Sequence, residues 1–336
     1  MSYRSAGVDI DAAEHAKNLM TVAVRRTHGP AVLAGIGAFG GAFALGATLQ
    51  KMTDPVLVAS TDGVGTKTMV ATAVGRFDTV GQDLVNHCIN DVLVQGARPL
   101  FFMDYFAAAQ LDPLMVERVV SGVATACEAA GCALLGGETA EMPGIYMPQA
   151  FDLAGTLVGV VDRAQLITGA AIRSGDVVLG LPSNGLHTNG YSLARKICEP
   201  IGYAATPPEL GGVSLGDALL EVHRSYLPQL DTLWGAGLEI KGMAHLTGGG
   251  IINNLPRVLP EGLSATIHTG TWPVPPIFAF LLRSVQLDPI ETYRTFNMGI
   301  GMALIVAPEK AAAARAAVEE LVVIGEIAPG QGVTLV

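Results

Sequence analysis

The sequence predicts an α/β protein of two domains. Short β-rich runs alternate with segments of helical spacing, a pattern typical of sheets covered by helices. The 336 residues exceed the usual size of one domain, which is about 150 residues. Half of the residues are hydrophobic and 15% are charged, a composition that supports a large core and excludes intrinsic disorder. The alternation of strand-like and helix-like segments begins anew near Gly169, so we place the domains at residues 1–168 and 169–336.

The expected elements follow from local signals. Asp9 or Asp11 is suited to cap a helix over residues 9–28, which Gly29-Pro30 ends. Apolar spacing predicts further helices at 81–96 and 113–130 and strands at 55–60, 99–106, 132–136 and 151–161. In the second half we expect strands at 177–181 and 302–307, and helices at 190–199, after the AHLTGGG segment, and at 309–321.

Charge and cysteine content limit the function classes. The net charge is −10 and no basic block is present, which argues against nucleic-acid binding but not against a phosphate ligand. The N-terminus lacks the apolar region of a signal peptide. The four cysteines form no C-x-x-C pair, so we expect reduced, mostly buried thiols in a cytoplasmic protein.

An uncharged stretch covers residues 29–50. Its length would allow a membrane span, but six glycines favour a buried strand-and-loop region, and we expect no membrane association. Within it, Gly35–Gly40 matches G-x-G-x-x-G, the dinucleotide fingerprint. A helix rather than a strand precedes the motif, so a glycine-rich turn in the core or a loop that closes over a ligand are alternatives.

Two segments predict phosphate or metal binding in the first domain. In 60–67, STDGVGTK, two glycines let backbone N–H groups face an anion, Lys67 adds a cation and Asp62 is a candidate Mg²⁺ ligand. A strand-to-helix turn with a capping aspartate is the alternative. The helix at 81–96 has one apolar face and one face of short polar residues, including Asp83, His87 and Asp91 at successive turns. Such oxygen ligands suit a divalent cation, whereas a solvated face is the alternative.

Three further segments combine glycine with polar residues. Glu138 and Glu141 follow an apolar strand in a glycine-rich turn, where they fit a second metal-ligand set or a helix start. His187 follows the strand at 177–181 and is a candidate general base or orienting residue, with a structural role as the alternative. Gly248–Gly250 precede a helix and form either an anion site or a tight turn.

Taken together, these blocks resemble the phosphoribosylformylglycinamidine cyclo-ligases, also called AIR synthetases. The resemblance covers residues 2–335 and includes, in order, YRSAGVDID, TDGVGTK, GQDLVNHCINDVLVQGARPLFFMDY, GGETAEMPGIY, GLHTNGYSL, AHLTGGG, NLPRVLP and YRTFNMGIG. It implies an N-terminal domain whose sheet pairs with a second copy in a barrel-like homodimer core. It also implies a C-terminal domain with helices on a mixed sheet, and an active-site cleft between the domains.

The resemblance implies a reaction in de novo purine biosynthesis. ATP phosphorylates the formyl amide oxygen of formylglycinamidine ribonucleotide, giving an iminophosphate. The amidine nitrogen then closes the ring, so that aminoimidazole ribonucleotide, ADP and phosphate are released. The implied cofactors are ATP as a substrate and Mg²⁺.

The resemblance also implies roles for single residues. His187, Lys67 and Asp62 are the expected catalytic residues, and Asp62, Asp91 and Glu138 the expected Mg²⁺ ligands. The expected ATP- and phosphate-binding residues are Gly63, Gly65, Thr66, Lys67, Asn90, Gly137, Gly248, Gly249 and Gly250. Family members often carry a lysine near the end of the first helix, where this chain has Arg25 and Arg26.

Other functions remain as alternatives. Within the superfamily they are enzymes like selenophosphate synthetase or thiamine-monophosphate kinase, and a hydrogenase-maturation dehydratase. The absence of a cysteine before Cys88 and the ending GVTLV count against the first and the last. Outside it, they are an NAD enzyme that uses Gly35–Gly40 and a nucleotide-binding scaffold without catalysis.

Overall fold

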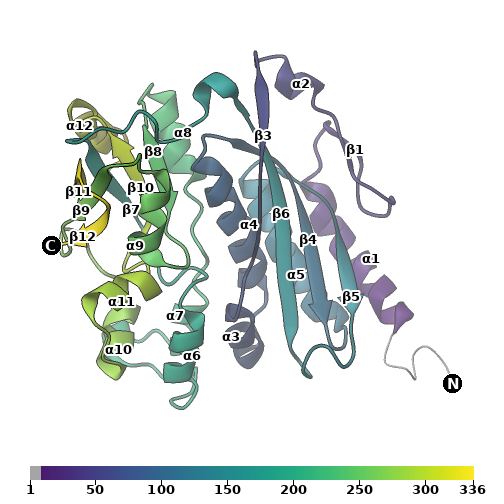
Figure 1. Ribbon diagram of the computed structural model, residues 1–336. Coiled ribbons are helices and arrows are strands. Elements are labelled where there is room, and N and C mark those ends of the chain that lie inside the picture. The colour runs from purple at the N-terminus through teal and green to yellow at the C-terminus, as the bar shows by residue number, and fades with distance from the viewer. Residues whose placement is uncertain (1–8) are drawn as a thin grey trace. The chain divides into compact units, whose positions relative to one another are not determined.

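The computed structural model describes residues 9–336, so the first six residues of the YRSAGVDID block lie outside the described residues. The described chain forms two compact units, one of residues 9–92 and 97–165, the other of 166–336 with the short segment 93–96. Each unit combines helices with a sheet (Figure 1), so the predicted α/β class is confirmed.

The first unit contains most of the elements that the sequence predicts. Asp9 caps the first helix by accepting hydrogen bonds from the main-chain N–H groups of residues 11 and 12. The strand predicted at 132–136 continues to Glu141, so the predicted turn around Glu138 is wrong. In chain order the elements are α1 (Ile10–Arg26), β1 (Val32–Ala34), β2 (Ala42–Phe43), α2 (Gly46–Leu49), β3 (Pro55–Gly63), α3 (Lys67–Val74), α4 (Asp78–Leu93), β4 (Arg98–Ala108), α5 (Pro113–Ala129), β5 (Ala133–Glu141) and β6 (Phe151–Asp162).

The four long strands form one mixed sheet in the order β3-β6-β4-β5. Only β4 and β5 run parallel, while β6 pairs antiparallel with β3 and β4. Helices α4 and α5 lie against one face of this sheet (Figure 1). The register aligns four residues in one row across the strands: Asp62, Gly155, Asp104 and Gly137.

Glycine lets α4 and α5 approach each other closely. A Cβ on Gly81 of α4 would lie 2.1 Å from the carbonyl oxygen of Val119, and one on Gly122 of α5 the same distance from that of Asp78. The predicted apolar face of α4 is confirmed, because its members are fully buried: Leu84, Val85, Cys88, Ile89, Val92 and Leu93. The helix that carries the polar candidates is therefore fixed on two sides.

The glycine-rich stretch at 29–50 is a strand-and-loop region, but it is not buried. It forms the antiparallel pair β1–β2 and the short helix α2, and every residue in it is at least partly exposed. The stretch does carry large apolar side chains, and two of them, Leu33 and Phe39, are exposed. Gly35–Gly40 connects β1 to β2 and does not open a helix, so the NAD alternative lacks its structural context.

The second unit is built on a six-stranded sheet in the order β12-β9-β11-β7-β10-β8, in which only β12 and β9 are parallel. Its core packs side chains of β7 and β10, such as Val178 and Ile305, against Ile251, Leu255 and Trp272. The mixed sheet with helices is the expected arrangement. Its elements are β7 (Val177–Pro182), α6 (Tyr191–Cys198), α7 (Leu215–Leu219), α8 (Leu227–Gly235), β8 (Gly242–His245), α9 (Gly250–Asn254), β9 (Leu263–Ile267), α10 (Pro276–Ser284), α11 (Pro289–Thr295), β10 (Ile300–Val306), α12 (Pro308–Ala317), β11 (Val322–Pro329) and β12 (Gly332–Leu335).

Two further expectations concern the chain as a whole. The cysteines are free and buried at all four positions, as predicted. Over residues 9–336, the helices are too short or too polar to cross a membrane.

Candidate active site

Two of the predicted metal ligands meet around a histidine. Asp62 stands at the end of β3, and His87 and Asp91 are one turn apart on α4. His87 Nε2 lies 2.8 Å from Asp62 Oδ2 and 3.8 Å from Asp91 Oδ2. Ser60 donates a hydrogen bond of 2.9 Å to Asp91, so the strand and the helix are joined by polar contacts. We call Asp62, His87 and Asp91 the carboxylate–histidine cluster.

In this cluster, each of Asp62 and His87 stabilises the charged form of the other. Burial alone would lower the pKa of His87, but the hydrogen bond to Asp62 and the charges of both carboxylates raise it. Burial alone would raise the pKa of Asp62, but the hydrogen bond and charge of His87 lower it. The carboxylate of Asp62 is therefore held ionised in a partly buried position, which is the state that a cation requires.

The polar face of α4 is not a solvated surface. Asp83 and Asn90 are fully buried, and His87 is 3% exposed. This finding disfavours the solvated alternative for the helix. Buried polar groups need partners, so this face has a specific structural or functional role.

Lys67 lies in a buried ion pair instead of on an open loop. Its Nζ is 2.8 Å from Asp83 Oδ2 and 2.9 Å from Oδ1, and both side chains are fully buried. An ammonium in this position would have to leave its partner to contact a phosphate, at a high desolvation cost. We therefore revise the expected role of Lys67 from a direct phosphate ligand to a residue that holds α3 against α4.

A cavity of about 830 Å³ lies beside β5 in the first unit. Its volume suits a small-molecule ligand. Helix α1, the Gly35–Gly41 loop, the middle of β4 and most of β5 line it, including Lys17, Asp104, Gly137 and Glu138. The loop is thus one wall of a cavity, which fits the ligand-covering alternative better than the core-turn alternative.

The two glutamates of the GGETAE segment have different surroundings. Glu141 accepts main-chain hydrogen bonds from Asp9 and Leu111, so it fixes the start of α1. Glu138 is exposed and lines the cavity. Asp62 and Gly137 stand at the two ends of the row across the sheet. Their backbones are three strand spacings apart, which is about 14 Å. One ion bound directly by Asp62 and Asp91 therefore does not reach Glu138. Glu138 could only belong to the ligands of a second ion.

Asp104 is a site candidate that the sequence predictions left out. It lies in the row between Gly155 and Gly137, and burial raises the pKa of its carboxyl to about 7. A carboxyl group near neutrality can carry or release a proton beside a bound ligand. An aspartate within the apolar run PLFFMDYF was the signal that could have identified it.

Arg26 does not line the cavity. It is half exposed, and its Nε lies 3.7 Å from Glu128 Oε2 on α5. Lys17, from the middle of α1, is part of the cavity wall. Among the described residues, Lys17 is therefore the basic side chain placed to contact a ligand in this cavity.

His187 occupies a tight loop of the second unit. Its φ angle is +61°, in the left-handed region that few non-glycine residues adopt, and its side chain is 1% exposed. Asn297 supports this loop by donating to Gly185 O and accepting from Ser183 Oγ. His187 Nε2 also lies 3.1 Å from Asn184 Oδ1. The surroundings fix the ring orientation, as an orienting role requires.

An asparagine side chain stabilises the turn at 248–250 that was predicted to bind phosphate. Gly249 and Gly250 have φ angles of +95° and +54°. Asn254 Nδ2 donates to the carbonyl groups of Thr247, Gly248 and Gly250, which stabilises the turn from within. The helix that follows, α9, has only five residues, so its dipole adds little to anion binding.

The remaining predicted ligands lie at two places in the first unit. Gly63, Gly65 and Thr66 connect β3 to α3 next to Asp62, and Gly65 has a φ angle of +64°. Asn90 is fully buried on α4, one residue before Asp91. All of them are close in sequence to the carboxylate–histidine cluster, whereas Gly137 belongs to the cavity.

Family models match both halves of the chain. The AIR synthase related protein N-terminal domain matches residues 45–161, and the C-terminal domain of the same family matches residues 173–336. A phosphoribosylformylglycinamidine cyclo-ligase of Desulfitobacterium hafniense is 52% identical over 97% of this chain and 96% of its own. A cyclo-ligase of the same name from Nitrosospira multiformis is 51% identical over 92% of this chain and 86% of its own.

Solved structures with the same fold are less similar to this chain in sequence. The hydrogenase maturation protein HypE of E. coli has a TM-score of 0.70 at 18% identity and covers 96% of this chain and 93% of its own. Thiamine-monophosphate kinase from Stenotrophomonas maltophilia has a TM-score of 0.69, also at 18% identity, over 94% and 95%. At such identities the likeness establishes the fold alone. Because both family domains match in order and relatives share half of their residues over nearly the whole length, the chain belongs to the AIR synthase related family and, within it, to the phosphoribosylformylglycinamidine cyclo-ligases.

Proposed function

We propose that this chain catalyses the ATP-dependent ring closure of formylglycinamidine ribonucleotide to aminoimidazole ribonucleotide, with release of ADP and phosphate. The identity of 52% to a named cyclo-ligase over 97% of the chain carries this proposal. An amide oxygen is a poor leaving group, and its phosphorylation gives an iminophosphate from which phosphate departs as the amidine nitrogen attacks. Positioning and charge neutralisation are the main demands of such a phosphoryl transfer.

Asp62 and Asp91 are the residues that would hold Mg²⁺. Their carboxylate oxygens are the donors that this ion prefers, and His87 bridges them in the protein alone. A cation bound there would replace the charge of His87 as the partner of the two carboxylates. When bound, Mg²⁺ would supply charge neutralisation for the phosphate oxygens of ATP. Glu138 stays a proposed ligand of a second ion at the cavity.

The cavity beside β5 is the proposed binding site for the nucleotide. Its volume, the glycine loop over it and the cation of Lys17 fit a nucleoside triphosphate. Backbone N–H groups of Gly63, Gly65 and Thr66 would face the phosphates from the other end of the row. Residues 1–168 would then form the ATP-binding and dimerising domain, and residues 169–336 would contribute His187 and the 248–250 turn to binding the ribonucleotide.

Lys17→Met should raise the KM for ATP by about 10-fold with little change in kcat, because one charge-assisted contact to a phosphate is lost. Steady-state kinetics with varied Mg-ATP measure this effect. Lys51→Met, at an exposed lysine outside the cavity wall, is the matched control and should leave the KM unchanged. Equal KM values for wild type and Lys17→Met would remove Lys17 from the ATP site.

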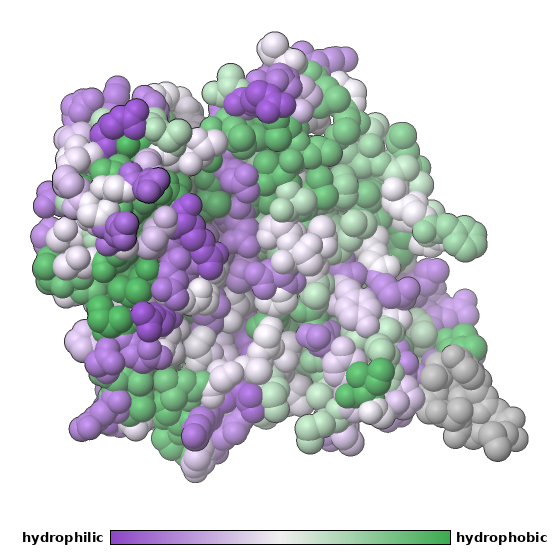
Figure 2. Space-filling model, in the orientation of Figure 1, coloured by the Kyte–Doolittle hydropathy of each residue, from purple (hydrophilic) through white to green (hydrophobic). Residues whose placement is uncertain are grey.

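A homodimer is the proposed assembly, formed through the open face of the first sheet. Neighbouring strands place Ala59, Val158 and Phe101 in one row on the face opposite α4 and α5. Leu57 and Met103 are exposed beside them. Figure 2 shows hydrophobic side chains gathered over the upper part of this sheet. An apolar surface of this kind is typical of an interface.

Leu57→Lys should shift the protein from dimer to monomer, because a charge would be buried in an apolar interface. Light scattering coupled to size-exclusion chromatography measures the mass directly. Leu114→Lys is the matched control, since Leu114 is 58% exposed and Leu57 is 59% exposed, but Leu114 lies on α5. A wild-type monomer, or a dimeric Leu57→Lys variant, would contradict this interface.

The reaction itself is tested by measuring ADP release from Mg-ATP with and without formylglycinamidine ribonucleotide while the aminoimidazole product is assayed. We expect substrate-dependent ADP release, matched one to one by product. Folded protein that binds ATP but shows no stimulation would refute the cyclo-ligase proposal. The free, buried cysteines support the accompanying proposal of a cytoplasmic location.

A further inference from the structure

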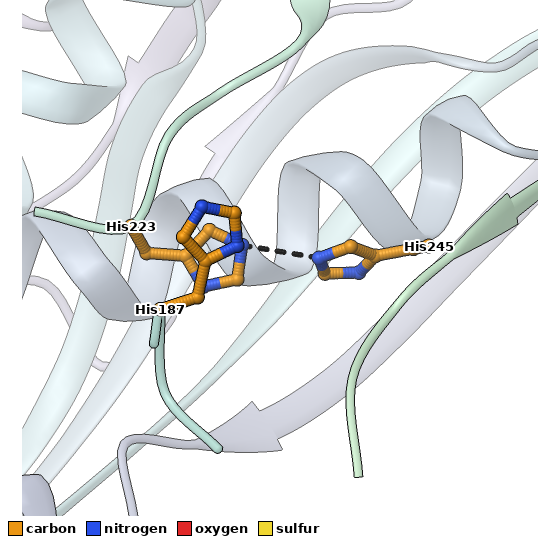
Figure 3. Close-up of side chains that lie close together, drawn as sticks. All are labelled: His187, His223 and His245. Atoms are coloured by element: carbon orange, nitrogen blue, oxygen red, sulfur yellow. Dashed lines mark hydrogen bonds between the residues drawn. The ribbon is translucent and has the colours of Figure 1, made fainter. Parts of the chain in front are cut away.

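Three histidines meet inside the second unit, each from a different segment. His187 belongs to the loop after β7, His223 to the connection between α7 and α8, and His245 ends β8. They are 1%, 0% and 5% exposed. Figure 3 shows ring nitrogens of His187 and His223 turned toward His245. We call these residues the histidine cluster.

The cluster brings one ligand atom of each ring within 4.8 Å of the others. His223 Nε2 and His245 Nε2 are 3.0 Å apart. The His187 ring stacks on that of His223, with centroids 4.1 Å apart and planes 20° apart, so the His187 ring would have to turn for its in-plane nitrogen to bind an ion held by the other two. Two nitrogens bound to one tetrahedral zinc ion are about 3.3 Å apart, given bonds of about 2.0 Å. The spacing of His223 and His245 already matches this value to within a few tenths of an ångström.

Contacts behind two of the rings determine which nitrogen is left for the other histidines. Thr188 Oγ1 lies 3.3 Å from His223 Nδ1, so the opposite nitrogen of that ring faces His245. Asn184 Oδ1 lies 3.1 Å from His187 Nε2. Hydrogen-bonding partners of this kind select the tautomer and aim the ligand nitrogen in metal–histidine sites. Gly301 makes room for the cluster, because a Cβ there would lie 2.6 Å from His187 Cε1.

From this geometry, we propose that the histidine cluster binds one first-row transition-metal ion of the zinc type. Three imidazole nitrogens suit zinc, nickel or copper, whereas Mg²⁺ prefers oxygen. The ion would take the place of the proton between His223 Nε2 and His245 Nε2. If that proton is on His223, it would move to Nδ1 of the same ring, where Thr188 Oγ1 can accept it. The donors of this site are imidazole nitrogens, whereas the proposed Mg²⁺ ligands are carboxylate oxygens.

Metal binding to the full chain tests this proposal without any turnover. Protein dialysed against a chelator is titrated with Zn²⁺ by calorimetry and with Co²⁺ by visible absorption, which reports tetrahedral coordination. We expect one ion per chain for wild type and at least about 100-fold weaker binding for His223→Gln and His245→Gln. His268→Gln, at an exposed histidine of the same unit, is the matched control and should bind as wild type does.

Two outcomes would overturn the proposal: wild type that takes up no stoichiometric zinc, and His223→Gln that binds zinc as tightly as wild type. Circular dichroism shows whether each variant is folded. If both variants unfold, the ring-nitrogen NMR shifts of the wild-type protein decide the question. Zinc should then move the nitrogen signals of three histidines, and unchanged signals would refute the site.

Discussion

Asp62→Asn is expected to lower kcat by at least about 100-fold, since the variant keeps the shape of the side chain but loses the charge that would hold Mg²⁺. The amide can still accept the hydrogen bond that Gly63 N–H donates to Asp62 Oδ1, so the end of β3 keeps its local support. The same loss is expected for Asp91→Asn, because both carboxylates face His87. Initial rates of product formation at saturating ATP and varied Mg²⁺ measure the effect.

Asp54→Asn is the control for Asp62→Asn. Asp54 directly precedes β3, whereas Asp62 lies near its end, and it forms an exposed ion pair with Arg163. We expect Asp54→Asn to keep the wild-type kcat. If Asp62→Asn does so as well, the carboxylate–histidine cluster is not a metal site and its role is structural.

Lys67→Met is expected to reduce the free energy of unfolding by about 3–5 kcal/mol, since it leaves the buried carboxylate of Asp83 without its ammonium partner. Both side chains are fully buried, so water cannot replace the lost contact. Urea unfolding followed by fluorescence or circular dichroism gives the free energy. Asp54→Asn again serves as the control, because an exposed pair contributes about 0–1 kcal/mol.

A double variant separates the ion pair from general packing. Lys67→Met combined with Asp83→Leu removes both charges, so it should be more stable than Lys67→Met alone. If instead Lys67→Met is as stable as wild type, the pair does not hold α3 against α4. Lys67 would then become available again for the phosphate role that the sequence predicted.

Local sequence signals predicted the elements of the fold but not all of their limits. The apolar face of α4 and the cap at Asp9 depend on neighbours in sequence, so periodicity identified them correctly. The end of β5 depends on pairing with β4, which a local pattern does not contain, and Glu138 was therefore placed in a turn. The exposure of residues 29–50 was missed because hydropathy measures composition and not the area that a loop can bury.

The candidate site was predicted in part. Asp62 was identified in a glycine-rich segment and Asp91 on the polar face of a predicted helix, and the structure brings both to one histidine. Lys67 was assigned from its position after a glycine loop, but its burial depends on Asp83, which lies one element later. The histidine cluster could not be predicted, because its three members come from segments that only the tertiary fold brings together.

The strand order of the first sheet also constrains how the chain acquires it. β6 lies between β3 and β4, yet it is the last of the four strands in the sequence. During folding, residues 55–63 therefore cannot pair in the sheet until residues 154–162 are available. Closing such a long loop is slow, and edges left unpaired in the meantime favour aggregation. During synthesis, the segment that carries Asp62 would stay without its sheet partner until β6 has left the ribosome, so its edge is unpaired for most of the time that this unit is being made.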